Sequence, residues 1–147
     1  MPEGGRYKEL PRPESFRFFE ERVSSYPFCI SVDKCDTQIY EIIRQGKSKL
    51  TVFLTNIYIV GEADIYEIVK LHPEVDTIVT ISLWNSYSLE AKELAKSFGV
   101  ALFKMNEFQG TIYYNGQKYI DYIPPERDEE YLQEEGIDKK KYLRIFV

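Results

Sequence analysis

A strand–helix–strand pattern between Val75 and Gly110 constrains the fold of this chain more than any other feature. Residues 77–82 and 100–103 are short apolar runs, and residues 89–98 between them repeat apolar side chains at helical spacing. Parallel neighbours in a sheet need a crossover connection of about this length. We therefore expect the two runs to lie side by side and parallel, with the helix crossing over them.

The connecting segment 89–98 predicts an amphipathic helix with one buried face. The residues expected to face inward are Ala91, Leu94, Ala95 and Phe98, at positions i, i+3, i+4 and i+7. The residues expected to face water are Glu90, Lys92, Glu93 and Lys96. Gly99 follows the last apolar position and is the expected stop.

Most of the remaining chain can be assigned in the same way. A stripe of Phe16, Phe19 and Val23 after Pro13 predicts a first helix, and residues 28–32 predict a short strand. A central buried strand is expected within residues 50–60. The spacing of Asp64 and Glu67 predicts a helix capped by Asp64.

Two segments carry conflicting or strong local signals. Residues 37–45 fit either a helix ending at Gly46 or a strand that turns through residues 46–49 into the next strand. Asn115-Gly116 lies between alternating large residues, which is the strongest short signal for a hairpin. We therefore expect a hairpin over residues 111–123 and leave 37–45 open.

These elements predict an α/β fold with three layers: a central mixed or parallel sheet, helices on both faces and a C-terminal β-hairpin. The expected organisation is a flexible N-terminal arm over residues 1–12 and a single α/β domain over 13–123. Residues 124–147 would form an acidic C-terminal extension that packs on the domain or on a partner. Its last nine residues, KKKYLRIFV, are basic and apolar.

Composition narrows the class of protein. The chain has 147 residues, 44% hydrophobic and 29% charged, which suits a single folded domain. Its 19 basic and 24 acidic side chains give a net charge of −5, so general binding to nucleic acid or to an anionic membrane is not expected. No apolar run is long enough to cross a membrane. With Cys29 and Cys35 interpreted as reduced thiols, we expect a cytoplasmic protein.

Polar residues follow the strand at 77–82, where open α/β sheets usually bind ligands. The candidate ligand-binding residues are Ser82, Trp84, Asn85, Ser86 and Ser88. They precede a helix whose free N–H groups suit a small anion. Capping of that helix by Ser86 or Ser88 is the simpler interpretation. Glycine-rich nucleotide-binding motifs are absent.

A second group of candidates consists of the acids Asp33, Asp36 and Glu41 after the first strand. Carboxylates gathered at strand ends can hold Mg²⁺. Turn, cap and solvated-surface roles explain the same residues equally well. Metal ligation is otherwise not expected.

The order of elements from Phe16 to Gly110 resembles the restriction-endonuclease-like fold, and is most similar to its Mrr-type branch. That order is a helix, a strand, a hairpin ending in LTVFLTN, a helix, the strand VDTIVTIS, the helix LEAKELAKSFG and the strand VALF. The resemblance implies an acid near Asp33, Asp36 or Glu41 and an acid-x-Lys on the next strand, which together bind Mg²⁺. That strand carries Phe53-Leu54-Thr55 instead, so the resemblance implies a domain that does not cleave.

Three functions remain open at this point. The first is a catalytically degenerate nuclease-fold domain with a nucleic-acid-related or regulatory role, and it needs a strand at 37–45. The second is a flavodoxin-like or Rossmann-like module that binds a small anionic ligand, and it needs a helix there. The third is a homodimeric interaction protein without catalysis, which would use the tyrosine-rich hairpin and the IFV segment.

Overall fold

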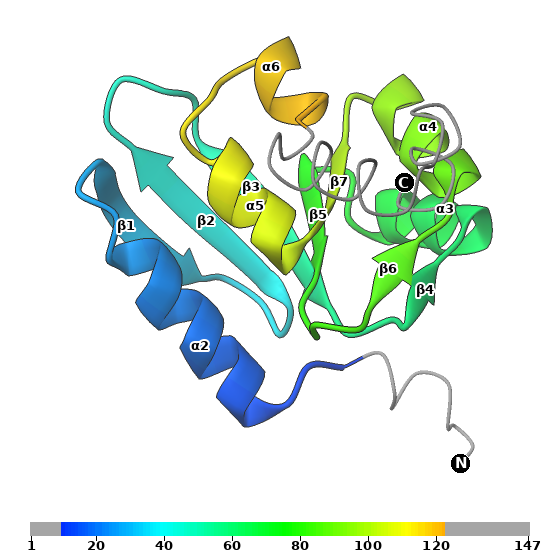
Figure 1. Ribbon diagram of the computed structural model, residues 1–147, viewed down its shortest axis with the longest axis horizontal. Helices are drawn as coiled ribbons and strands as arrows, with labels where there is room; N and C mark the ends of the chain where they lie inside the picture. Colours follow the sequence, from blue (N-terminus) through cyan, green and yellow to red (C-terminus); the bar gives the residue numbers. More distant parts are fainter. Residues whose placement is uncertain (1–9, 123–147) are drawn as a thin grey trace, which may run out of the picture.

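Two parallel strands joined by one helix form one side of the main sheet. In the computed structural model, which describes residues 10–122, β5 (Thr77–Thr80) pairs with β7 (Ala101–Lys104), and α4 (Leu89–Ser97) connects them. The two strands are parallel, with Ile78 opposite Leu102. The expected strand–helix–strand unit is confirmed (Figure 1).

An antiparallel hairpin and a third strand extend this pair into a five-stranded mixed sheet. Its order is β1 (Cys29–Lys34), β2 (Ile39–Arg44), β3 (Leu50–Thr55), β5 and β7. β2 is antiparallel to both of its neighbours, whereas β3 is parallel to β5. Segment 37–45 is therefore strand in its central part. The flavodoxin-like alternative, which needed a helix there, lacks that element.

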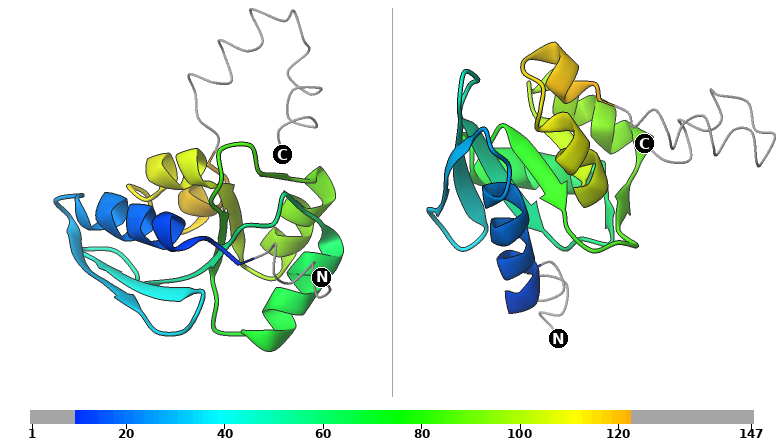
Figure 2. Two further views of the ribbon diagram at one scale, coloured as in Figure 1. Left: turned by 90° about the horizontal axis from the view of Figure 1, so that it is seen from below. Right: turned by 60° about the vertical axis from the view of Figure 1, so that its left-hand side comes forward.

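Helices cover both faces of the sheet. α2 (Pro13–Ser24), α5 (Met105–Thr111) and α6 (Gln117–Ile120) lie on one face, while α3 (Glu62–Leu71) and α4 lie on the other (Figure 2). Phe19, Phe108 and Tyr119 belong to the core of the first face. Ile65 and Ala95 belong to the core of the second. The expected three-layer α/β architecture is confirmed.

A second, very small sheet lies beyond the ends of β3 and β5. It consists of β4 (Ile59–Val60) and β6 (Ser86–Tyr87), which pair in parallel. Val60 and Tyr87 are buried, and each strand runs directly into the start of a helix. The segments that follow β3 and β5 are thereby joined to each other.

The expected C-terminal hairpin is absent. Residues 111–122 instead contain the end of α5, a turn and the short helix α6, which begins after Gly116 at a φ of +64°. The buried guanidinium of Arg44 holds this turn, because its Nη1 donates to the carbonyl oxygens of Ile112 and Tyr114 at 2.9 and 2.7 Å. Its Nη2 and the Ser48 hydroxyl both donate to Asn115 Oδ1. Asn115 thus forms a long-range contact, which the local Asn-Gly motif could not predict.

Two further local expectations are corrected. Asp64 is not the N-cap of α3; Gly61 occupies that position, and Asp64 Oδ2 accepts its N–H at 2.8 Å from inside the first turn. Phe98, which was expected on the buried face of α4, is 44% exposed and packs edge-on against the ring of Tyr66.

The other expectations have simpler outcomes. Cys29 and Cys35 are both free thiols. Within residues 10–122, no helix is long and apolar enough to cross a membrane. The N-terminal arm through residue 9 and the acidic extension 124–147 lie outside the described residues.

Replacing Arg44 with methionine should destabilise the domain strongly. The substitution leaves the carbonyl oxygens of Ile112 and Tyr114 without their donor. A hydrogen bond to a charged group contributes roughly 1.5–3 kcal/mol to stability. We expect a lower urea midpoint with an unchanged slope. Lys47→Met, in the adjacent turn, is the matched control and should shift the midpoint little. Equal midpoints for the two variants would contradict the anchoring role of Arg44.

Candidate functional site

The polar residues expected to bind a ligand form a closed network at the ends of β3 and β5. The buried Asn85 amide donates to Asn56 Oδ1 and to Thr80 Oγ1, both at 2.9 Å. The Ser82 hydroxyl donates to the same Asn56 oxygen. The Thr80 hydroxyl in turn donates to the carbonyl of Ile57. These side chains bind each other, so their first role is to fix the two loops.

The serines nearest to α4 are also used within the fold. Ser88 is the N-cap, and its hydroxyl accepts the Ala91 N–H at 3.0 Å. Ser86 lies in β6, where its N–H donates to the carbonyl of Tyr58. The capping interpretation is therefore confirmed for Ser88. The side chains of Ser82, Asn85 and Ser88 are thus engaged within the fold, and anion binding at this site stays a prediction.

Trp84 differs from its polar neighbours because its side chain is 73% exposed. Leu83 beside it is 88% exposed, and Tyr58 and Ile59 on the adjoining loop are 62% and 55% exposed. The backbone bond between Ser86 and Tyr58 holds the two loops together. We call these four residues the Trp84 surface. Sequence reasoning placed Trp84 at the site but did not identify the other three.

The three candidate acids lie apart from any metal-binding arrangement. Asp33 on β1 is opposite Glu41 on β2, and Asp36 lies in the turn between these strands, where it accepts the Thr37 N–H. Glu41 forms an exposed ion pair with Lys49 at 3.6 Å. Among residues 10–122, no group of three or more potential ligands could hold a metal ion. Solvated and turn roles explain these acids, since exposed ion pairs contribute little.

The most unusual titratable group in the described domain is Lys92, which is only 2% exposed. Its Nζ donates to the carbonyl of Leu102 at 2.6 Å and lies 4.5 Å from the ring centre of Phe103. Burial lowers the pKa of Lys92 from 10.5 to about 8, and the nearby Glu107 carboxylate partly opposes this. The expectation that Lys92 faces water is therefore wrong.

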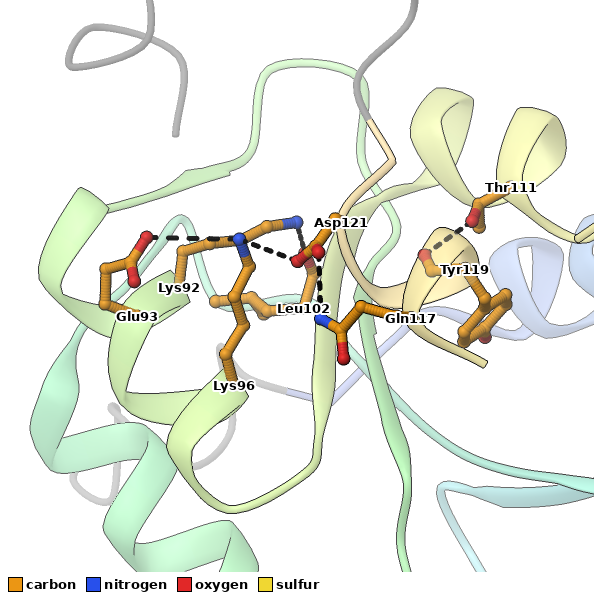
Figure 3. A network of polar contacts seen from close by, with 8 residues as sticks. All are labelled: Lys92, Glu93, Lys96, Leu102, Thr111, Gln117, Tyr119 and Asp121. Atoms are coloured by element: carbon orange, nitrogen blue, oxygen red, sulfur yellow. Dashed lines mark hydrogen bonds and ion pairs between the residues drawn. The ribbon is translucent and has the colours of Figure 1, made fainter. Parts of the chain in front are cut away.

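Further polar and aromatic groups lie near this amine; Figure 3 shows its bond to Leu102 and the neighbouring ion pair of Lys96 with Asp121. The Tyr87 hydroxyl donates to both oxygens of Glu107, at 2.8 and 3.0 Å, and the ring of Tyr87 lies 5.1 Å from Lys92 Nζ. Glu107 also accepts the backbone N–H of Lys104. One turn further along α4, Lys96 pairs with Asp121 at 3.1 Å. Lys92 thus connects α4 to β7, β6 and α5.

Small residues on α4 explain why periodicity alone missed this lysine. Ala91 and Ala95 are both fully buried, and alanine lets a helix approach a sheet closely. The buried face then widens to include the neighbouring position 92. Both inward alanines are followed by a lysine, Lys92 and Lys96, so the sequence does not show which of the two is buried.

The chemistry open to this cluster is limited by its burial. A lysine with a pKa near 8 is the type that can act as a base or nucleophile. Here the amine donates a hydrogen bond to the carbonyl of Leu102 and is enclosed by the rings of Tyr87 and Phe103. We therefore interpret the cluster as packing that fixes α4 on β7.

Comparisons with known proteins add no family or relative: no protein-family model, curated protein or solved structure matches the chain.

Lys92 should make the stability of the domain depend on pH above neutrality. Because its pKa is lowered on folding, the unfolded chain binds more protons between about pH 8 and 10.5, and the free energy of unfolding rises with pH there. The gap between 10.5 and about 8 corresponds to on the order of 3 kcal/mol. Urea titrations across this window should show the rise.

Two variants isolate the contribution of Lys92 from that of other titrating groups. Lys92→Met should remove the rise, whereas Lys96→Met, one turn along the same helix, should retain it. An identical pH profile for the wild type and Lys92→Met would refute a buried, titrating amine at this position.

Proposed function

We propose that residues 16–110 form a restriction-endonuclease-like domain that does not cleave and that has a nucleic-acid-related or regulatory role. The observation that carries the proposal is the order of elements: a helix, a three-stranded antiparallel unit, and then two parallel strands each preceded by a helix. This order agrees with the resemblance seen in the sequence. The strand at Ile39–Arg44 is the element that the nuclease-fold interpretation required.

The absence of cleavage follows from the residues on β3. Phe53 and Leu54 are buried and apolar, and Thr55 is buried beside them. No acid-x-Lys is available there to bind Mg²⁺ and activate water. Lys47 and Lys70 are two lysines that could reach this strand from elsewhere in the chain, but Lys47 lies over the ring of Phe28 at 5.6 Å. The other, Lys70, lies in the last turn of α3.

A patch at one end of the hairpin supports contact with nucleic acid. Tyr26 and Phe28 stack at 5.5 Å, and the half-exposed Tyr113 packs edge-on against both rings. Lys47 lies beside these rings, and the turn from Gln45 to Lys49 contains two lysines and no acid. Lysines that contact phosphates next to aromatic rings that stack on bases are typical of single-stranded nucleic acid sites.

The acidic charge of the whole chain limits this contact to a local patch. With a net charge of −5, we expect weak binding that is lost at moderate salt concentration. Duplex DNA, single-stranded DNA and RNA, each with Mg²⁺ or Mn²⁺, should remain uncleaved. Fluorescence anisotropy at low salt should detect binding to single strands first.

Neutralising the patch should change the salt dependence in a defined way. Lys47→Gln with Lys49→Gln removes two cations, and each phosphate contact contributes roughly 0.7 to the slope of log K against log salt for single strands. We expect the slope to fall by the contribution of two contacts, while Lys70→Gln leaves it unchanged. Absence of binding at low salt would remove the nucleic-acid role. Metal-dependent cleavage would overturn the non-cleaving assignment.

A further inference from the structure

We propose that residues 139–147 of this chain bind the Trp84 surface. The proposal does not depend on the nuclease-like function, because it concerns a different face of the domain. It assigns an occupant to the exposed apolar side chains beyond the ends of β3 and β5, and a role to a basic, apolar segment of the chain.

The backbone segments that carry the four residues of the Trp84 surface lie next to each other. Its members come from two loops that the β4–β6 pairing joins, with Ile59 directly opposite Ser86. All four side chains are more than half exposed. Contiguous exposed apolar residues mark interaction sites, whereas isolated ones are ordinary. β4 and β6 form a two-stranded sheet with no third strand among residues 10–122.

The charges around the surface define the chemistry of its partner. Residues 56–69 and 81–91, which contain the surface and the helix starts beside it, hold no basic residue. Their acids are Glu62, Asp64, Glu67 and Glu90. An apolar surface with an acidic border suits a segment that is both apolar and basic. The same charge disfavours nucleic acid here.

Residues 139–147 have the complementary composition. Four of the nine are basic, namely Lys139, Lys140, Lys141 and Arg144, and none has an acidic side chain. The other five are Tyr142, Leu143, Ile145, Phe146 and Val147. Aromatic and aliphatic side chains make up this apolar set, which suits packing against exposed side chains such as Trp84 and Tyr58.

The length of the intervening chain allows this contact within one molecule. Between Tyr122 and Lys139 lie 16 residues, which span up to about 55 Å when extended. A domain of this size has a radius of gyration of only about 13 Å. A tethered segment also acts at a high effective concentration, so that a modest intrinsic affinity suffices.

Trp84 is the only tryptophan in the chain and therefore reports on its own surface. The test compares the full-length protein with a full-length Ile145→Asp/Phe146→Asp variant by tryptophan emission and acrylamide quenching. Bound residues 139–147 shield the indole, so we expect the variant to emit at longer wavelength and to be quenched more strongly. Tyr131→Asp/Leu132→Asp, in the acidic segment, is the matched control and should behave as the wild type. Raising the salt concentration should move the wild type toward the variant.

Two measurements separate this proposal from its alternatives. A peptide of residues 139–147, added to the Asp variant, should restore the shielded emission, whereas a scrambled peptide should not. The emission of the wild type should not change on dilution. Loss of shielding on dilution would make a second copy of the chain the occupant and overturn the intramolecular contact. Equal emission and quenching of the wild type and the Asp variant would overturn the proposal altogether.

Discussion

Burial of β3 and β5 on both faces is the constraint on which the rest of the structure depends. Every residue of β3, β5 and β7 is buried, so this parallel unit cannot exist without a helical layer on each side. The chain supplies α3 and α4 as the crossovers that cover one face. The other face is covered from the two ends of the described chain, by α2 before the sheet and by α5 and α6 after it.

This arrangement determines where polar groups meet. Loops that leave the ends of buried strands carry backbone and side-chain groups that need partners. The network of Asn56, Ser82 and Asn85 provides these partners beyond β3 and β5. Arg44 does the same near the opposite end of the sheet, where it binds the carbonyls after α5. Of the predicted ligand-binding residues, Ser82, Asn85 and Ser88 therefore have their side chains engaged in holding the fold together.

The spacing of apolar residues predicted those helices and strands whose buried side is evident from the local sequence. The unit from β5 to β7 is correct because its strands are apolar and its helix has one inward stripe. Periodicity could not decide between helix and strand at residues 37–45, because the buried positions of β2 include Arg44 and its half-buried positions include Ile43, so the apolar residues do not alternate in the sequence. It also failed where contacts distant in sequence override a local rule. Asn115-Gly116 favours a hairpin locally, but Arg44 and Ser48 bind Asn115 from about 70 positions away in the chain.

Lys92 and Trp84 both differ from the burial that is usual for their residue types: the lysine is buried and the tryptophan is exposed. A lysine on an amphipathic helix is expected in water and a tryptophan in the core. In this domain the lysine is enclosed because two alanines draw α4 onto the sheet, and the tryptophan is exposed because Asn85 beside it occupies the interior position in the loop. The polar side chain fixes the backbone and the aromatic one is left outside. The exposed surfaces at Trp84 and at Tyr113 are thus aromatic and apolar. The two binding proposals differ because the charges differ: acids near Trp84 would favour a basic segment, whereas lysine near Tyr113 would favour phosphate.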